Sequence, residues 1–246
     1  MYMKNELKIL GKNGNLYSLE EYLKLQGNTY HYAVGIIFES PIIGKRVLAF
    51  DSWKEKWANE EKKYTKCLSE SEAIQSLCGS DNTERIVEIQ DYEDDMTAAK
   101  RCWEYKAGCL QWYLPSLMEL GVIYTFRDEI NEAMKLLGCE SDCLLPTACN
   151  TAVWSNSENG KSHSWLIRFN TGCFDICCKS SSLIVRAVAT LPKESGISPD
   201  FEEHNPTLGK TYFVPNIKDL PDAELATELR NRGFKGELTK EIKLIV

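Results

Sequence analysis

The stretch WLIRFNTGCFDIC, residues 165–177, bears most directly on the fold, because apolar and polar residues alternate on both sides of a turn signal. A period of two is typical of β-strands, and Asn170-Thr171-Gly172 is typical of a hairpin turn. The stretch therefore predicts two antiparallel strands. The side of this hairpin that we assign to a core carries four large apolar residues: Ile167, Phe169, Phe174 and Ile176.

The opposite side of the predicted hairpin mixes chemical types. It carries an aliphatic side chain, a cation, an acid and two thiols: Leu166, Arg168, Cys173, Asp175 and Cys177. The exposed sides of antiparallel strands are mostly polar. We therefore interpret the composition of this side as selected for a role other than keeping the protein soluble.

Apolar runs on either side of the hairpin predict further strands, at residues 30–38, 45–50 and 183–191. Residues 52–93 are charged and rich in turn signals, and they predict loops and short helices with a solvated surface. Beyond Pro192 the composition becomes acidic and loop-like. Within this tail, residues 221–232 have the pattern of an amphipathic helix.

Helical patterns precede the hairpin in three segments. In residues 16–25, Ser18 with Glu21 three positions later matches a capping box. A second helix is expected to begin at Asp94 or Asp95. A third helical region starts at Pro115 and ends at Gly138, a residue suited to a left-handed helix cap.

The composition excludes several classes of protein. The 246 residues include 29 Lys and Arg against 36 Asp and Glu, a net charge of −7, which disfavours a nucleic-acid partner because such binding needs clustered cations. No apolar run reaches the roughly 18 residues of a membrane-spanning helix, so no membrane insertion is expected. The first ten residues lack the apolar stretch of a signal peptide. The common hydrolase, zinc-protease and phosphate-loop motifs are also absent.

Ten cysteines stand out in such a chain, but their spacing gives no disulfide framework and no CxxC pair. We expect no metal and no cofactor, since no histidine lies near a cysteine pair at zinc-ligand spacing. One alternative is a metal site that includes Cys139, Cys143 and Cys149. Another is a nucleophilic thiol beside an imidazole, formed by His163 with Cys173, Cys177 or Cys178.

A set of residues between 112 and 188 resembles the pattern of a bacterial and phage family. Written loosely, the family pattern is WYLPS-x-EL, IN, G, YWSS-x-E, AW-x-x-x-F-x-x-G, K and VRAV. Val153 stands here where an aromatic residue is usual. The residues that carry the resemblance are Trp112–Ser116, Glu119, Leu120, Ile130, Asn131, Leu137, Gly138, Val153, Trp154, Ser155, Glu158, Ser164, Trp165, Phe169, Gly172, Lys179 and Val185–Val188. The family includes the variable proteins of diversity-generating retroelements. It shares the C-type-lectin-like fold of formylglycine-generating enzymes.

The resemblance implies an α+β, C-type-lectin-like fold with two main helices and a small twisted antiparallel sheet. This domain would span residues 30–191 and contain a variable region at about 150–184. A short N-terminal appendage would cover residues 1–29, and a C-terminal tail would cover residues 192–246.

In such variable proteins, buried residues hold the fold while exposed positions are diversified by adenine-directed mutagenesis. By position, the implied ligand-binding set here is Asn156, Asn159, His163, Leu166, Arg168, Asn170, Cys173, Asp175, Cys177, Cys178, Ser180, Ser181, Ser182 and Leu183. Much of this set coincides with the chemically mixed side that strand alternation indicates.

These observations predict a receptor-binding protein rather than an enzyme, with a protein or cell-surface ligand and a phage tail as its expected location. The helix at 221–232 would mediate a homo-oligomer or docking to the tail. Two alternatives stay open. One is a cysteine oxidase of the formylglycine-generating type, which needs a dedicated cysteine pair and copper, and the other is a structural virion or assembly module.

Overall fold

The computed structural model describes residues 7–90, 95–149 and 151–191. Its strands are β1 Lys8–Gly11, β2 Leu16–Ser18, β3 Ala33–Ser40, β4 Gly44–Lys56, β5 Trp112–Tyr113, β6 Ala152–Glu158, β7 His163–Arg168, β8 Cys173–Cys178 and β9 Ser182–Thr190. Its helices are α1 Leu19–Gln26, α2 Glu70–Ala73, α3 Gly79–Gln90, α4 Ala98–Trp103, α5 Leu117–Thr125 and α6 Arg127–Leu136.

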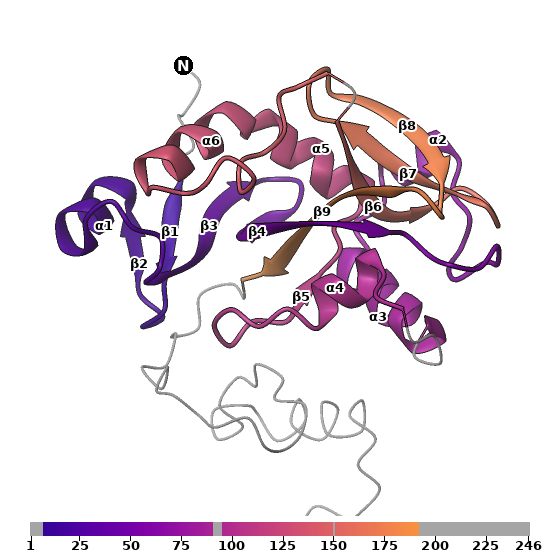
Figure 1. Cartoon of the computed structure of the whole chain (residues 1–246), viewed down its shortest axis with the longest axis horizontal. Helices are drawn as coiled ribbons and strands as arrows, with labels where there is room; N and C mark the ends of the chain where they lie inside the picture. Colours follow the sequence, from indigo (N-terminus) through magenta and orange to yellow (C-terminus); the bar gives the residue numbers. More distant parts are fainter. Residues whose placement is uncertain (1–6, 91–94, 150, 192–246) are drawn as a thin grey trace, which may run out of the picture. The chain divides into compact units, whose positions relative to one another are not determined.

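All nine of these strands belong to one mixed sheet (Figure 1). The strand order is β2-β1-β3-β4-β9-β6-β7-β8, and β5 pairs with β9 beside that path. Neighbouring strands are antiparallel except for β6 and β9, which are parallel. Strand β8 is therefore the last strand at one edge of the described sheet.

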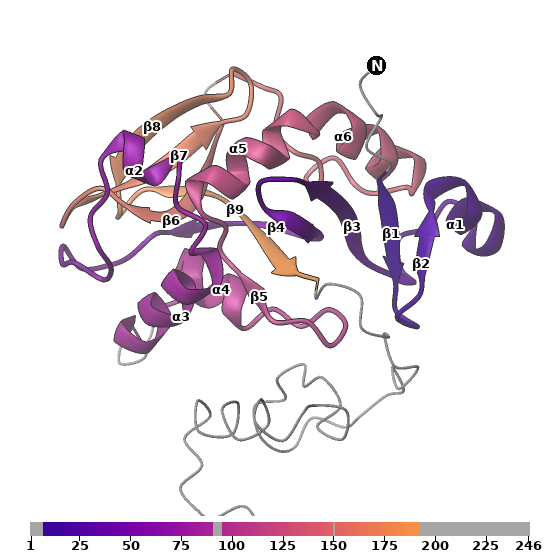
Figure 2. The same ribbon diagram turned by 180° about the vertical axis from the view of Figure 1, so that it is seen from behind.

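The sheet has a hydrophobic core on each face, because alternate residues of its central strands point to opposite sides. Leu48 and Val188 enter one core, which also contains residues of α1, α5 and α6. Their neighbours Val47 and Ala189 enter the other core, with residues of α3 and α4. Figures 1 and 2 show α5 and α6 on one face of the sheet and α3 and α4 on the other.

Several local predictions are confirmed. Ser18 caps α1 and forms the expected capping box with Glu21. Gly138 follows α6 with a left-handed φ of 72°. The predicted hairpin forms as β7 and β8, and Gly172 in its turn has a φ of 74°. These features depend on short-range sequence signals.

The predicted C-type-lectin-like arrangement of two main helices and a small twisted antiparallel sheet is wrong. The sheet is large and mixed, and the described residues contain six short helices instead of two main ones. Residues 8–11 and 16–18, expected within an N-terminal appendage, form β1 and β2, and β1 pairs with β3. Residues 52–56, expected as loop, continue β4 along β9. Pairing with a distant strand holds this charged stretch extended, which its own composition does not predict.

Helix boundaries differ from the predictions in three places. The helix expected over residues 16–25 begins at Leu19, because residues 16–18 form β2. The helix expected from Asp94 or Asp95 begins at Ala98, after Thr97 as its N-cap. The helical region expected from Pro115 consists of two helices that meet at Phe126. The tail at 192–246, with its expected helix at 221–232, lies outside the described residues. None of the helices in the described part of the chain has the length and apolar character needed to cross a membrane.

Candidate functional site

The β7–β8 hairpin brings most of its chemically mixed residues onto one side. Arg168 lies opposite Cys173, and Asp175 lies opposite Leu166. Directly opposed residues of antiparallel strands share a face, so Arg168, Cys173, Asp175 and Cys177 share one side. The Cys177 thiol lies 3.3 Å from the Ser181 hydroxyl. We call the exposed or half-exposed residues Arg168, Cys173, Asp175, Cys177 and Ser181 the hairpin surface.

An ion pair occupies the centre of the hairpin surface. The Asp175 carboxylate accepts hydrogen bonds from Nε and Nη2 of Arg168, at 3.0 and 2.7 Å. The Arg168 guanidinium lowers the pKa of Asp175. Both side chains are well exposed, at 37% and 41%. Such exposed pairs contribute at most about 1 kcal/mol to stability, so this pair is available for contacts with a ligand.

Two residues predicted for the exposed set are buried, and these assignments are wrong. Leu166 is 2% exposed because it packs against the second core, where Trp154 and Val185 lie. Asn156 is fully buried. Conversely, Ile176 was assigned to the core but is 42% exposed, since β8 is the edge strand.

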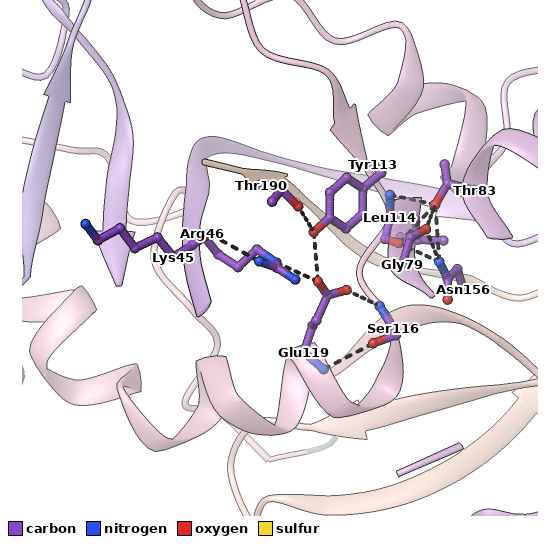
Figure 3. Close-up of polar contacts among 10 residues, drawn as sticks. All are labelled: Lys45, Arg46, Gly79, Thr83, Tyr113, Leu114, Ser116, Glu119, Asn156 and Thr190. Carbon is purple, nitrogen blue, oxygen red and sulfur yellow. Dashed lines mark hydrogen bonds and ion pairs between the residues drawn. The ribbon is translucent and has the colours of Figure 1, made fainter. Parts of the chain in front are cut away.

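Asn156 serves the framework instead of a ligand face. Its side-chain amide donates hydrogen bonds to the carbonyl oxygens of Gly79 and Leu114, at 2.5 and 2.9 Å. Thr83 Oγ1 lies in the same cluster and bonds to the same two residues (Figure 3). Asn156 therefore joins β6 to the start of α3 and to the segment before α5.

The other predicted site residues are spread around the hairpin. Cys178, Ser180 and Ser182 are exposed, whereas Asn159, His163, Asn170 and Leu183 are half-buried. The Asn159 amide lies 3.5 Å from the carbonyl oxygen of Leu68. Only part of the predicted set thus forms one surface, and the hairpin surface is that part.

A second buried polar cluster centres on Glu119 (Figure 3). Its carboxylate accepts hydrogen bonds from the Tyr113 hydroxyl at 2.7 Å and from Arg46 Nε at 2.8 Å. It also accepts one from the Ser116 backbone N–H, and the Ser116 hydroxyl caps α5 in return. Burial of the hydroxyl beside the Glu119 charge raises the pKa of Tyr113. This cluster fixes the start of α5 against β4 and β5.

A buried ion pair anchors the end of the hairpin. The Lys179 ammonium contacts the Glu158 carboxylate, and these side chains are 2% and 0% exposed. The same carboxylate accepts hydrogen bonds from the backbone N–H groups of Tyr64 and Thr65. Lys179 lies 4.7 Å from the centre of the Trp57 ring. Burial lowers the pKa of Lys179, although the Glu158 charge opposes this shift.

Arg186 of β9 is a third buried charge. Its guanidinium donates hydrogen bonds to the carbonyl oxygens of Ala49, Phe50 and Cys143. Full burial lowers the pKa of Arg186 to about 10. This side chain joins β9 to β4 and to the segment after α6.

The residues that carry the family resemblance are mostly buried, including Trp112, Glu119, Trp154, Glu158 and Arg186. They therefore specify the framework and not a site. The sequence indicates this framework role, because a single charged residue such as Arg186 lies within an apolar run. A charge that is buried with such a run requires polar partners from other segments.

The structure brings together one thiol–imidazole pair among the alternatives that the sequence predicts. Cys178 Sγ lies 3.4 Å from His163 Nε2 on the exposed hairpin. In contrast, no group of three His, Cys, Asp or Glu residues that could hold a metal ion occurs within the described residues. All ten cysteines are free thiols.

Comparison with known proteins gives a likeness in fold. No family model matches the chain, and no curated protein matches it either. Among solved structures, a fimbrial protein from Bacteroides ovatus ATCC 8483 is similar, with a TM-score of 0.54 and 12% sequence identity. The likeness covers 76% of this chain and 48% of that chain. This chain thus spans about half the length of that protein.

Proposed function

We propose that the chain binds a protein or cell-surface ligand through the hairpin surface. The observation that carries this proposal is the placement of Arg168, Cys173, Asp175, Cys177 and Ser181, which differ in chemistry and are at least partly exposed, on one side of an edge hairpin. Varied side chains on a rigid support are typical of recognition surfaces.

The free edge of β8 adds backbone groups to this surface. Among the described strands, β8 pairs with β7 alone, so its outer edge can pair with an added strand. Two groups of β8 already have local partners: the Ile176 N–H donates to Asp175 Oδ1, and the Cys178 carbonyl oxygen accepts from the Ser181 N–H. Ligands that bind in this way gain affinity from main-chain hydrogen bonds and specificity from neighbouring side chains. An extended segment of a protein ligand fits both features.

Both ends of the hairpin are fixed by contacts to the framework. Beyond β8, Lys179 enters its buried ion pair with Glu158. At the turn, Arg127 Nη1 donates a hydrogen bond of 2.5 Å to the carbonyl oxygen of Phe169. A surface held in this way loses little conformational entropy when a ligand binds. It also tolerates changes to its exposed residues without unfolding.

We extend this proposal to diversification of the surface by a retroelement. The coding DNA tests this extension. Codons of the form NNC or NNT, in which N is any nucleotide, should be concentrated at the positions of the hairpin surface. A near-copy of the segment, differing only at adenines, should lie close to the gene. Ordinary codons with no such copy would remove the diversification claim but leave the binding claim unaffected.

A peptide library displayed on phage and panned against the full chain provides a direct probe of binding. Selected peptides should bind wild type but lose affinity for the double variant Arg168→Ala/Asp175→Ala. A matched control removes a different exposed ion pair, between Glu20 and Lys24 of α1. Peptides that bind the Arg168→Ala/Asp175→Ala variant as well as wild type would contradict the proposal.

A structural role in a surface appendage or virion is the second candidate function. It is favoured by the likeness to a fimbrial protein and by the unpaired edge of β8, which a second copy could extend. The mass of the full chain in solution separates the two functions. Growth of large assemblies with concentration supports the structural role, whereas a constant mass supports the ligand-binding role.

A further inference from the structure

A thiol and an imidazole meet on the side of the hairpin opposite to the hairpin surface. His163 and Cys178 are directly opposed residues of β7 and β8, and Cys178 Sγ lies 3.4 Å from His163 Nε2. Cys178 is exposed and His163 is half-buried. This distance is within the range of a hydrogen bond that involves sulfur.

The backbone on both sides of this pair is held in place. The carbonyl oxygen of His163 accepts hydrogen bonds from the N–H groups of Asn159 and Gly160, both at 3.1 Å. The residue after Cys178 is Lys179, whose side chain lies in the buried ion pair and whose N–H donates to Ser162 at 2.8 Å. The framework therefore holds the backbone of both residues so that their side chains start from opposed positions of the hairpin.

We propose that Cys178 is a reactive thiol activated by His163, and that the site takes small disulfides as its substrates. His163 Nε2 accepts the thiol proton, and the Cys178 thiolate attacks one sulfur of the disulfide. The original S–S bond breaks as the new one forms, and the departing thiolate takes the proton from the imidazolium. The product is a mixed disulfide at Cys178, and the reagent disulfide is the oxidant.

Two other cysteines of the hairpin provide internal comparisons. Cys173 is exposed on the same strand, and it lies opposite Arg168, whose positive charge favours a thiolate but which cannot accept the thiol proton. Cys177 is half-buried, and its thiol contacts the Ser181 hydroxyl. Thiol exchange depends on loss of the thiol proton and on access, and Cys178 combines an exposed thiol with an imidazole nitrogen 3.4 Å away.

The test is incubation of the reduced full chain with oxidised glutathione, followed by mass spectrometry of peptides that resolve Cys173 from Cys178. We expect Cys178 to form the mixed disulfide at least about tenfold faster than Cys173. This factor is smaller than the rate increase of roughly 100-fold or more that a positioned general base typically contributes. His163→Gln should remove this advantage and leave the rate at Cys173 unchanged.

Equal rates at Cys178 and Cys173 in the wild-type chain would overturn the proposal without any variant. An unchanged Cys178 rate in a folded His163→Gln variant would overturn the role of His163. The ligand-binding proposal is independent of both results, because its test replaces Arg168 and Asp175 and leaves His163 and Cys178 in place.

Discussion

A Lys179→Met variant is expected to lose about 3–5 kcal/mol of unfolding free energy relative to the wild type. Methionine keeps much of the side-chain volume but removes the ammonium group. The Glu158 carboxylate would then remain buried with its charge uncompensated, although Tyr64 and Thr65 still donate hydrogen bonds to it. Urea denaturation measures the difference.

The control for this prediction is an exposed ion pair that also joins a lysine to a glutamate. Lys66 and Glu72 are 2.9 Å apart, and their side chains are 76% and 46% exposed. Lys66→Met should cost no more than about 1 kcal/mol. In the double variant Glu158→Gln/Lys179→Met, the second substitution should cost much less than it does alone, because the two side chains are coupled. A loss of under about 1 kcal/mol for Lys179→Met would contradict the role of the pair as an anchor.

A Trp154→Ala variant is expected to lose a similar amount, about 3–5 kcal/mol, because it removes a large buried aromatic side chain and leaves a cavity. Trp154 is fully buried in the core that also contains Leu166 and Val185. Its indole N–H donates a hydrogen bond of 3.2 Å to the carbonyl oxygen of Glu55. The truncation thus weakens contacts of β6 with both β4 and β7.

Trp53→Ala is the matched control, since Trp53 packs against the same core but is only half-buried. Thermal or urea denaturation of the two variants gives the comparison. A loss for Trp154→Ala no larger than the loss for Trp53→Ala would show that Trp154 is not a central element of this core.

Local sequence signals predicted the hairpin and the helix caps, because turns and caps depend on residues a few positions apart. The turn at Asn170-Thr171-Gly172 predicted the hairpin but left its register open, and the structure places Arg168, not Phe169, opposite Cys173. In this register His163 lies opposite Cys178, and a shift by one residue would place it opposite Lys179, so the sequence alone did not determine this pair.

The size of the sheet depends on long-range pairing, and the sequence did not predict it. Residues 52–56 are charged and have no strand signal of their own, yet they pair with residues 182–186 of β9. Leu166 alternates with polar residues as an exposed position would, but side chains from β6 and β9 cover it. Asn156 looks like a surface residue, and its partners Gly79 and Leu114 lie far away in the sequence.

The distribution of charges explains why the framework and the surface can be separated experimentally. Glu119, Glu158 and Arg186 are buried, and their contacts join distant segments. Arg168 and Asp175 contact each other at the edge of the sheet and are well exposed. Substitution of the buried charges should therefore change stability, whereas substitution of the exposed pair should change binding.

The most direct test of the binding surface is the dissociation constant of one panned peptide for three full-length proteins: wild type, Arg168→Ala/Asp175→Ala and Glu20→Ala/Lys24→Ala. We expect at least about tenfold weaker binding for the first variant, which corresponds to about 1.4 kcal/mol, and unchanged binding for the second. The unfolding free energy of each variant should stay within about 1 kcal/mol of wild type. Equal dissociation constants for all three folded proteins would contradict a ligand site on the hairpin surface.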